Sequence, residues 1–155
     1  MDAQIEVATV LDAEAILALQ RKAYQSEAIL YQDWAIPPLV ETLEDLQSGF
    51  GQMIVLKAVV AHVLAGSVRG TAKGSTCEVG RLIVDPIFQR RGIGTQLMHS
   101  LERLFPAVAR FELFTGSRSE ANIRLYERLG YRVFRTQVLS PKLTLVFMQK
   151  ANGGA

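Results

Sequence analysis

A short loop rich in arginine and glycine is the part of the sequence best suited to hold an anion. Residues 89–94 read QRRGIG and lie between a β-type run and an amphipathic run of helical spacing. Glycines let a backbone turn tightly and approach a ligand without a Cβ in the way. The free N–H groups and the dipole at a helix start favour a negatively charged ligand. The positive charges of Arg90 and Arg91 strengthen this preference. The loop therefore predicts a pyrophosphate cradle, or else a plain strand-to-helix turn.

The glycine spacing excludes two other phosphate-binding loops. A P-loop needs a Gly-Lys-Ser/Thr sequence, which does not follow here. A Rossmann fingerprint needs second and third glycines at a spacing that residues 89–94 do not have. The remaining chemistry is the binding of a phosphate-bearing ligand at a helix start, and the elements on either side must position it.

Strand and helix patterns around the loop define the fold class. Alternation predicts strands over 4–10, 52–58, 63–70, 76–84, 110–115, 131–140 and 143–150. Helical spacing predicts helices over 13–24 and 42–47, a third after the QRRGIG loop, and a fourth over 120–129 between Ser119 as N-cap and Gly130. Residues 31–38 are expected to be irregular, because two consecutive prolines disfavour a helix interior. The order β-α-α-β-β-β-α-β-α-β-β predicts an α/β (α+β) fold with a mixed sheet.

Composition and length bound the class of protein. The chain has 155 residues, of which 49% are hydrophobic and 21% charged, as in a globular domain. We expect one domain over 1–150 and a loose tail over 151–155. The single cysteine, Cys77, excludes an internal disulfide framework and a metal site built from several thiolates, and we expect no metal. A net charge of +2 and the lack of a long apolar run predict neither a nucleic-acid nor a membrane partner, and a cytoplasmic location.

Three segments of the sequence resemble one enzyme family. QRRGIG resembles the Q/R-x-x-G-x-G/A motif of the GCN5-related N-acetyltransferases (GNAT family), which bind acetyl-CoA. Residues 82–86, LIVDP, resemble the strand that precedes this motif, and residues 122–131, NIRLYERLGY, resemble the family's N-x-x-x-L-Y-x-x-x-G-F/Y segment. The resemblance covers residues 54–150 well, and the N-terminal third only by helix order.

The resemblance implies a fold, a cosubstrate and a reaction. The sheet is expected to splay between the fourth and fifth strands, with the thioester of acetyl-CoA in the gap. The reaction is direct transfer of the acetyl group to a primary amine in a ternary complex. The residues that the resemblance assigns to the cofactor are Leu82, Ile83, Val84, Gln89, Arg90, Arg91, Gly92, Gly94, Thr95, Asn122 and Tyr126. Leu82 would also offer its N–H to the oxyanion.

Two side chains are candidates for proton transfer. A primary amine has a pKa of about 10.4 and must lose a proton to attack. Glu78 is the predicted base, because some family members carry a glutamate four residues before the position of Leu82; Glu112 is a weaker rival. Tyr126 is the predicted acid for the departing thiolate, because the family's tyrosine at this position approaches the CoA sulfur. The alternative is a purely positional role for the tyrosine, which shares a helix face with Asn122.

The charges of the N-terminal third suggest an acceptor pocket. No lysine or arginine lies between Ala23 and Leu56, while this stretch holds five acidic residues. One interpretation is a set of solvated helix faces. The other is an acidic, aromatic-lined pocket for a small cationic amine, with cation–π contacts. The residues proposed for it are Glu27, Tyr31 and Trp34 as the principal contacts, with Tyr24, Asp33 and Glu41 beside them.

Two other kinds of function stay open at this stage. A non-catalytic acyl-CoA-binding regulator would keep the cradle and lose the acceptor chemistry, and an interaction module would have a blocked acceptor cleft. Polyamines, aminoglycosides, amino acids and protein amines all stay open as the acceptor. An acyl chain longer than acetyl also stays open. The final hairpin offers a sheet edge through which a homodimer can form.

Overall fold

The strands of the chain form one mixed sheet. The computed structural model describes residues 2–153, and the strands in that range form a seven-stranded sheet in the order β1-β2-β3-β4-β5-β7-β6. Their bounds are Gln4–Val7 (β1), Ile54–Val60 (β2), Val63–Lys73 (β3), Thr76–Val84 (β4), Arg110–Gly116 (β5), Arg132–Ser140 (β6) and Leu143–Ala151 (β7). All neighbours are antiparallel except β4 and β5, which are parallel. The predicted α/β class and mixed sheet are confirmed.

The helices confirm the predicted order and add short segments to it. They are α1 (Ala13–Ala23), α2 (Gln25–Tyr31), α3 (Pro37–Val40), α4 (Leu43–Gly49), α5 (Ile93–Arg103) and α6 (Glu120–Arg128), with 3-10 turns at Val10–Asp12 and Pro86–Phe88. The expectation of an irregular segment over 31–38 was partly wrong. The two prolines occupy the first positions of α3, where a missing N–H breaks no helical hydrogen bond.

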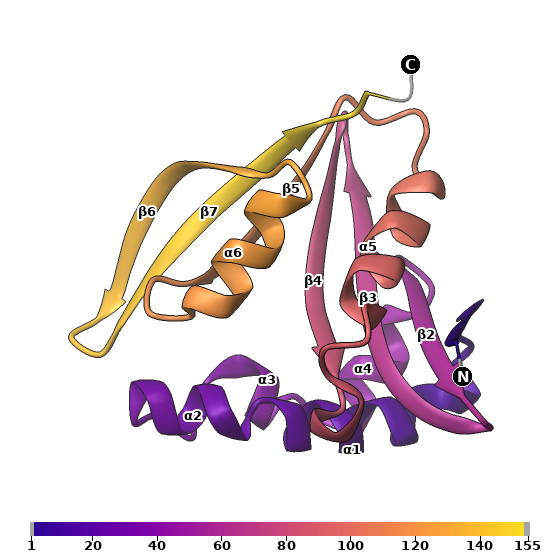
Figure 1. Ribbon diagram of the computed structural model, residues 1–155. Coiled ribbons are helices and arrows are strands. Elements are labelled where there is room, and N and C mark those ends of the chain that lie inside the picture. The colour runs from indigo at the N-terminus through magenta and orange to yellow at the C-terminus, as the bar shows by residue number, and fades with distance from the viewer. Residues whose placement is uncertain (1, 154–155) are drawn as a thin grey trace.

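The sheet splits between its two parallel strands. β4 and β5 are in register only from Thr76 to Glu78 on β4 and from Arg110 to Glu112 on β5. Beyond these three pairs the strands diverge, and Figure 1 shows β4 and β5 meeting near one end and separating toward the helices α1 and α2. The predicted splay between the fourth and fifth strands is present. It leaves a wedge-shaped opening whose edges are backbone rather than side chains.

Two layers of helix cover opposite faces of the sheet. Helix α5 packs on β2, β3 and β4 through Ile93, Leu97, Met98 and Leu101, all of which belong to the larger core cluster. On the other face, α1 and α4 form a smaller cluster that includes Val55 of β2. Successive residues of a strand point to opposite faces, so β2 contributes Leu56 to one cluster and Val55 to the other. The sheet is therefore packed between α5 on one face and α1 with α4 on the other.

The C-terminal segment is more ordered than the sequence predicts. Ala151, placed by the prediction in a loose tail, is the last residue of β7. The side-chain amide of Asn152 donates a hydrogen bond to the carbonyl of Val108 at 2.9 Å, and residues 154 and 155 lie outside the described range. Among residues 2–153, no helix is long and apolar enough to cross a membrane.

Candidate active site

One cavity occupies the wedge between β4 and β5. Its volume is about 810 Å³, and it is lined by the diverging part of β4, the end of β5, the start of α5, the first turns of α6, and residues of α1, α2 and α3. The cavity therefore joins the QRRGIG loop at one side to the N-terminal helices at the other. A long ligand held by the loop and a second molecule held by the helices would meet in the middle.

The wall formed by β4 is an edge without a strand partner. From Val79 to Val84 no described strand pairs with the side of β4 that faces β5. On the other side of β4, the register with β3 jumps from Gly80 to Ile83, so Arg81 and Leu82 together oppose one residue. This is a β-bulge, a feature common beside active sites. The free edge offers backbone N–H and C=O groups to an extended ligand.

The QRRGIG loop forms the start of α5 as predicted. Gly92 is the residue before the helix and has φ +76°, where a Cβ would be strained but would meet no atom within 4 Å. The open space beside Gly92 is what an anion cradle requires. Asp85 fixes the strand end ahead of the loop, because both its oxygens accept hydrogen bonds from Lys22 of α1 at 3.1 Å.

Most residues predicted to bind the cofactor line this cavity. They are Leu82, Ile83, Val84, Gln89, Arg90, Gly92, Gly94, Thr95, Asn122 and Tyr126. The predicted Arg91 is not among the lining residues, and its guanidinium lies over the ring of Phe88, 5.4 Å from the centroid. Sequence alone does not reveal this difference between two adjacent arginines, because it depends on which way the loop turns.

Tyr126 and Asn122 lie one turn apart on α6, and both face the cavity. The hydroxyl of Tyr126 forms no hydrogen bond with any other residue in the described range, and its ring packs edge-on against Tyr131. Burial raises the pKa of Tyr126 above its ordinary value, and the nearby Tyr24 and Glu27 raise it further. The tyrosine is therefore protonated at neutral pH and has a proton to donate.

A directed chain of hydrogen bonds closes the open end of the wedge. Ser119 Oγ donates to Glu27 Oε2 at 2.7 Å and lies 2.8 Å from the hydroxyl oxygen of Tyr31. A serine has a single hydroxyl proton. Because Ser119 gives it to Glu27, Tyr31 must donate to Ser119, and Tyr31 in turn accepts from the N–H of Arg118 at 3.0 Å. Asn122 Nδ2 donates to the other carboxylate oxygen of Glu27 at 3.1 Å.

This chain corrects one expectation and leaves Glu27 in an unusual position. Ser119 is the residue before α6, but its side chain accepts no hydrogen bond from the first turn of that helix, and its hydroxyl is instead bonded to Glu27 and Tyr31. Glu27 lines the cavity with both carboxylate oxygens held by neutral donors. No cation within the described range forms an ion pair with Glu27, so its negative charge is available to a positively charged ligand.

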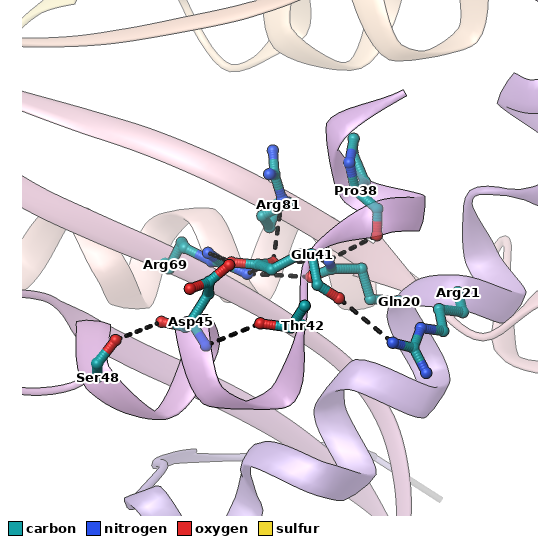
Figure 2. Close-up of polar contacts among 9 residues, drawn as sticks. All are labelled: Gln20, Arg21, Pro38, Glu41, Thr42, Asp45, Ser48, Arg69 and Arg81. Atoms are coloured by element: carbon teal, nitrogen blue, oxygen red, sulfur yellow. Dashed lines mark hydrogen bonds and ion pairs between the residues drawn. The ribbon is translucent and has the colours of Figure 1, made fainter. Parts of the chain in front are cut away.

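A second carboxylate, Glu41, is neutralised by two arginines (Figure 2). Arg69 of β3 donates to both Glu41 oxygens at 3.0 and 2.9 Å, and Gln20 Nε2 donates at 2.8 Å. Burial opposes ionisation of Glu41, but the hydrogen bonds from Arg69 and Gln20 and the charges of Arg69 and Arg81 outweigh it. They lower the pKa of Glu41 to about 2. The predicted acidic pocket is therefore wrong at Glu41, because arginines from β3 and β4 cover that carboxylate.

Two other predicted residues lie away from the cavity. Glu78 is in the paired part of β4, with its side chain 51% exposed and its carboxylate 3.3 Å from Lys73 Nζ. It does not line the cavity, because the strands diverge only after this position. Trp34, predicted to contact the acceptor, is 57% exposed and is also absent from the lining. Tyr31 and Glu27 do line it.

Sequence reasoning missed Arg81, Arg69 and Ser119 as parts of this site. All three line the cavity. Arg81 has φ +52° at the bulge, and neither the bulge nor the backbone angle can be recognised from the sequence. Ser119 could have been found from its position at the start of the α6 motif, but a capping role was the more common reading.

Comparisons with known proteins show the family and agree with the fold. The model of the acetyltransferase (GNAT) family matches residues 13–131. A GNAT-family acetyltransferase from Streptococcus pneumoniae is 18% identical, with a TM-score of 0.79 over 98% of this chain and 100% of that one. The ribosomal-protein-S18-alanine N-acetyltransferase from Escherichia coli is 19% identical, with a TM-score of 0.81 over 99% and 96%.

A third structure was solved with a ligand. It is the PaiA N-acetyltransferase from Thermoplasma acidophilum in complex with coenzyme A, 16% identical, with a TM-score of 0.76 over 97% of this chain and 99% of that one. These structural likenesses show the fold, and the family match covers well over half of the chain. The chain therefore belongs to the GNAT family of acetyltransferases and is an acetyl-CoA-dependent N-acetyltransferase.

Proposed function

We propose that this enzyme transfers the acetyl group directly from acetyl-CoA to a primary amine, with both substrates in the wedge between β4 and β5. The observation that carries the proposal is the continuity of the cavity. One space of about 810 Å³ is lined by the QRRGIG loop, the free edge of β4, Tyr126 and Glu27. Direct transfer requires the thioester and the amine to meet in one space from which bulk water is largely excluded.

The residues present fit acetyl-CoA. Gly92 leaves open space at the start of α5, where a pyrophosphate would accept N–H hydrogen bonds. The free edge of β4 from Val79 to Val84 can pair with the amides of the pantetheine arm as an added strand would. Asn122 and Tyr126 flank that arm from α6. When bound, acetyl-CoA supplies the activated acetyl group.

Glu27 takes the part of general base in place of Glu78. The ionised carboxylate lines the cavity and is held in place by Ser119 and Asn122, neither of which carries a charge. An approaching ammonium would be attracted to it and would lose its proton to it, directly or through a water. We prefer Glu27 to Glu78 as the base, because Glu78 does not line the cavity.

Two further groups act on the charges that develop during transfer. Leu82 lies at the bulge on the free edge of β4, where its N–H can stabilise the oxyanion of the tetrahedral intermediate. Tyr126, which burial keeps protonated, donates its hydroxyl proton to the departing thiolate. Starting from the ammonium form, the amine nitrogen loses two protons in one turnover. Glu27 accepts one and releases it to solvent, and the other, lost after the attack, replaces the proton that Tyr126 gives to the thiolate.

Calorimetry of acetyl-CoA binding and a thiol-release screen test this function together. Gly92→Glu places a carboxylate in the cradle and should abolish binding. Gly74→Glu is the matched control, since Gly74 also has a positive φ (+60°) and open space around it but lies in the β3–β4 turn. We expect wild type and Gly74→Glu to bind, and at least one amine in a broad panel to release CoA.

Other results would point to different functions. Equal loss of binding in both variants would mean that backbone strain, and not the cradle, is responsible. Binding without turnover of any amine would favour the acyl-CoA-binding regulator. A homodimer through the edge strand β6 and a cytoplasmic location stay predictions.

A further inference from the structure

A cluster of three charged side chains, Arg69, Arg81 and Glu41, lies at the acceptor side of the cavity and carries more positive than negative charge. Arg69 and Arg81 share a single carboxylate, that of Glu41. Arg69 holds it by two hydrogen bonds of 3.0 and 2.9 Å, whereas Arg81 Nε lies 3.7 Å from Oε1, beyond hydrogen-bonding distance. The cluster therefore carries one uncompensated positive charge, and Arg81 is the residue that bears it.

Arg81 is partly buried, and one nitrogen of its guanidinium lacks a hydrogen bond. Its side chain is 22% exposed, and its Nε is a buried donor with no partner among the residues the structure describes. Buried polar groups are almost always hydrogen-bonded, because an unpaired one loses its interactions with water and gains nothing. Because Nε is covered, the exposed part of the Arg81 side chain is what can meet a ligand in the cavity that this residue lines.

The backbone at Arg81 also indicates a functional position. Its φ of +52° is uncommon for a side chain of this size, and it occurs at the bulge where β4 lacks a register partner on β3. Figure 2 shows the guanidinium of Arg81 extending away from Glu41, on the side opposite to Asp45 and Ser48. The bulge therefore places a cation that lines the cavity while its Nε stays within ion-pair distance of Glu41.

We propose that the acceptor is an amine that also carries a carboxylate, and that Arg81 binds this carboxylate. The inference rests on the proposed function and adds the class of acceptor to it. A guanidinium matches a carboxylate with two parallel hydrogen bonds. Glu27 then binds the ammonium group of the acceptor, and Arg81 binds the carboxylate of the acceptor. The predicted small cationic amine becomes a zwitterionic one.

Matched pairs of acceptors test this class. The panel contains glycine, β-alanine, γ-aminobutyrate and the L-amino acids, each beside its amide, together with polyamines and peptides. The three ω-amino acids vary the spacing between amine and carboxylate. We expect kcat/KM for at least one acid to exceed that of its amide by about ten- to a hundredfold, the value of a charged hydrogen bond.

Variants of Arg81 connect the preference to this residue. Arg81→Gln should remove the discrimination between acid and amide by lowering kcat/KM for the acid to that of its amide, and it should leave the Kd of acetyl-CoA unchanged. Arg81→Lys keeps the charge and should retain part of the preference. Arg124→Gln is the matched control, since Arg124 is 65% exposed on α6 and pairs only with Glu120 at 4.0 Å. Circular dichroism and urea unfolding verify that each variant is folded.

Three results would overturn the inference and leave the proposed function intact. They are turnover of polyamines or peptides but of no amino acid, equal kcat/KM for acids and amides, and an acid preference that survives in Arg81→Gln. A tenfold weaker Kd of acetyl-CoA in Arg81→Gln would instead assign Arg81 to the cofactor. If no amine at all releases CoA from an enzyme that binds acetyl-CoA, the proposed function fails, and this inference fails with it.

Discussion

Ser119 donates its only hydroxyl proton to Glu27, and this bond of 2.7 Å joins α2 to the first turn of α6 across the open end of the wedge. The two residues are far apart in sequence, since Glu27 lies on a helix that precedes β4 and Ser119 lies between β5 and α6. The bond fixes the carboxylate that we propose as general base, and it fixes the direction of every hydrogen bond behind it. Four predictions follow from this arrangement and from the site around it.

Glu27→Gln should reduce kcat by about 100-fold or more, because removal of a general base costs that much. The Kd of acetyl-CoA should not change, since Glu27 lies on the acceptor side of the cavity. Steady-state kinetics and calorimetry measure the two quantities. Glu78→Gln serves as the comparison, and we expect nearly wild-type kcat from it because Glu78 does not line the cavity. The reverse ranking of the two variants would restore Glu78 as the base.

Tyr126→Phe should lower kcat by about 100-fold with little change in the Kd of acetyl-CoA, because only the proton donor is lost. Burial raises the pKa of Tyr126, so the acid form persists at alkaline pH. The wild-type rate should therefore show no decline due to Tyr126 up to the ordinary tyrosine pKa of about 10. A pH–rate profile of both proteins to pH 10 is the measurement. A purely positional tyrosine would leave kcat within a few-fold of wild type.

Gly116→Ala should disrupt the hydrogen-bond chain from the side of β5. A Cβ at this position would overlap the hydroxyl of Tyr31, which is buried and bonded to Ser119. Tyr31 would have to move, and Ser119 would lose the partner that orients it. We expect a loss of stability of about 1–3 kcal/mol from overpacking together with a lower kcat. Urea unfolding and kinetics give these values.

A milder variant separates the two effects in Gly116→Ala. Tyr31→Phe removes only the hydroxyl and should cost about 1 kcal/mol of stability, as the loss of a buried hydrogen bond does. A kcat that falls in both variants would connect the chain to catalysis. A wild-type kcat in Tyr31→Phe would limit the chain to a structural role.

Glu41 should make stability depend on pH below neutrality. Its pKa is lowered from 4.5 to about 2 in the folded protein, so the folded state favours the ionised form. The contribution is complete above pH 4.5 and is lost as the pH falls toward 2. At about 1.4 kcal/mol per pKa unit it is on the order of 3 kcal/mol. Urea unfolding of wild type and Glu41→Gln from pH 7 to pH 2.5 measures it.

The difference in unfolding free energy between wild type and Glu41→Gln isolates the contribution of Glu41. The difference in unfolding free energy between wild type and Glu41→Gln should be constant from pH 7 to 5 and should narrow below pH 4.5. Glu44→Gln, an exposed neighbour on α4, should show no such dependence. If the difference in unfolding free energy between wild type and Glu41→Gln stays constant down to pH 2.5, Glu41 is not held in its ionised form by Arg69 and Arg81.

The parts of the site that depend on local sequence were predictable. The QRRGIG loop, Asn122 and Tyr126 each lie within one short motif, so their spacing largely determines their placement. Glu78 was misplaced because its position relative to the cavity depends on where β5 leaves β4, a property of two strands about 35 residues apart. Glu41 was misread because the arginines that neutralise it come from other strands. Arg81 was missed because its orientation arises from a bulge.

The three residue pairs that join β4 to β5 are the point about which the two half-sheets would rotate relative to each other. Beyond them, the six residues from Val79 to Val84 extend for about 20 Å at roughly 3.3 Å per residue. Across such an arm, a relative rotation of about 3° between the two half-sheets moves the far ends by about 1 Å. Cys77 and Phe111, which form the middle one of these pairs and are almost fully buried, therefore lie where a small change in packing would be magnified at the far end of the cavity.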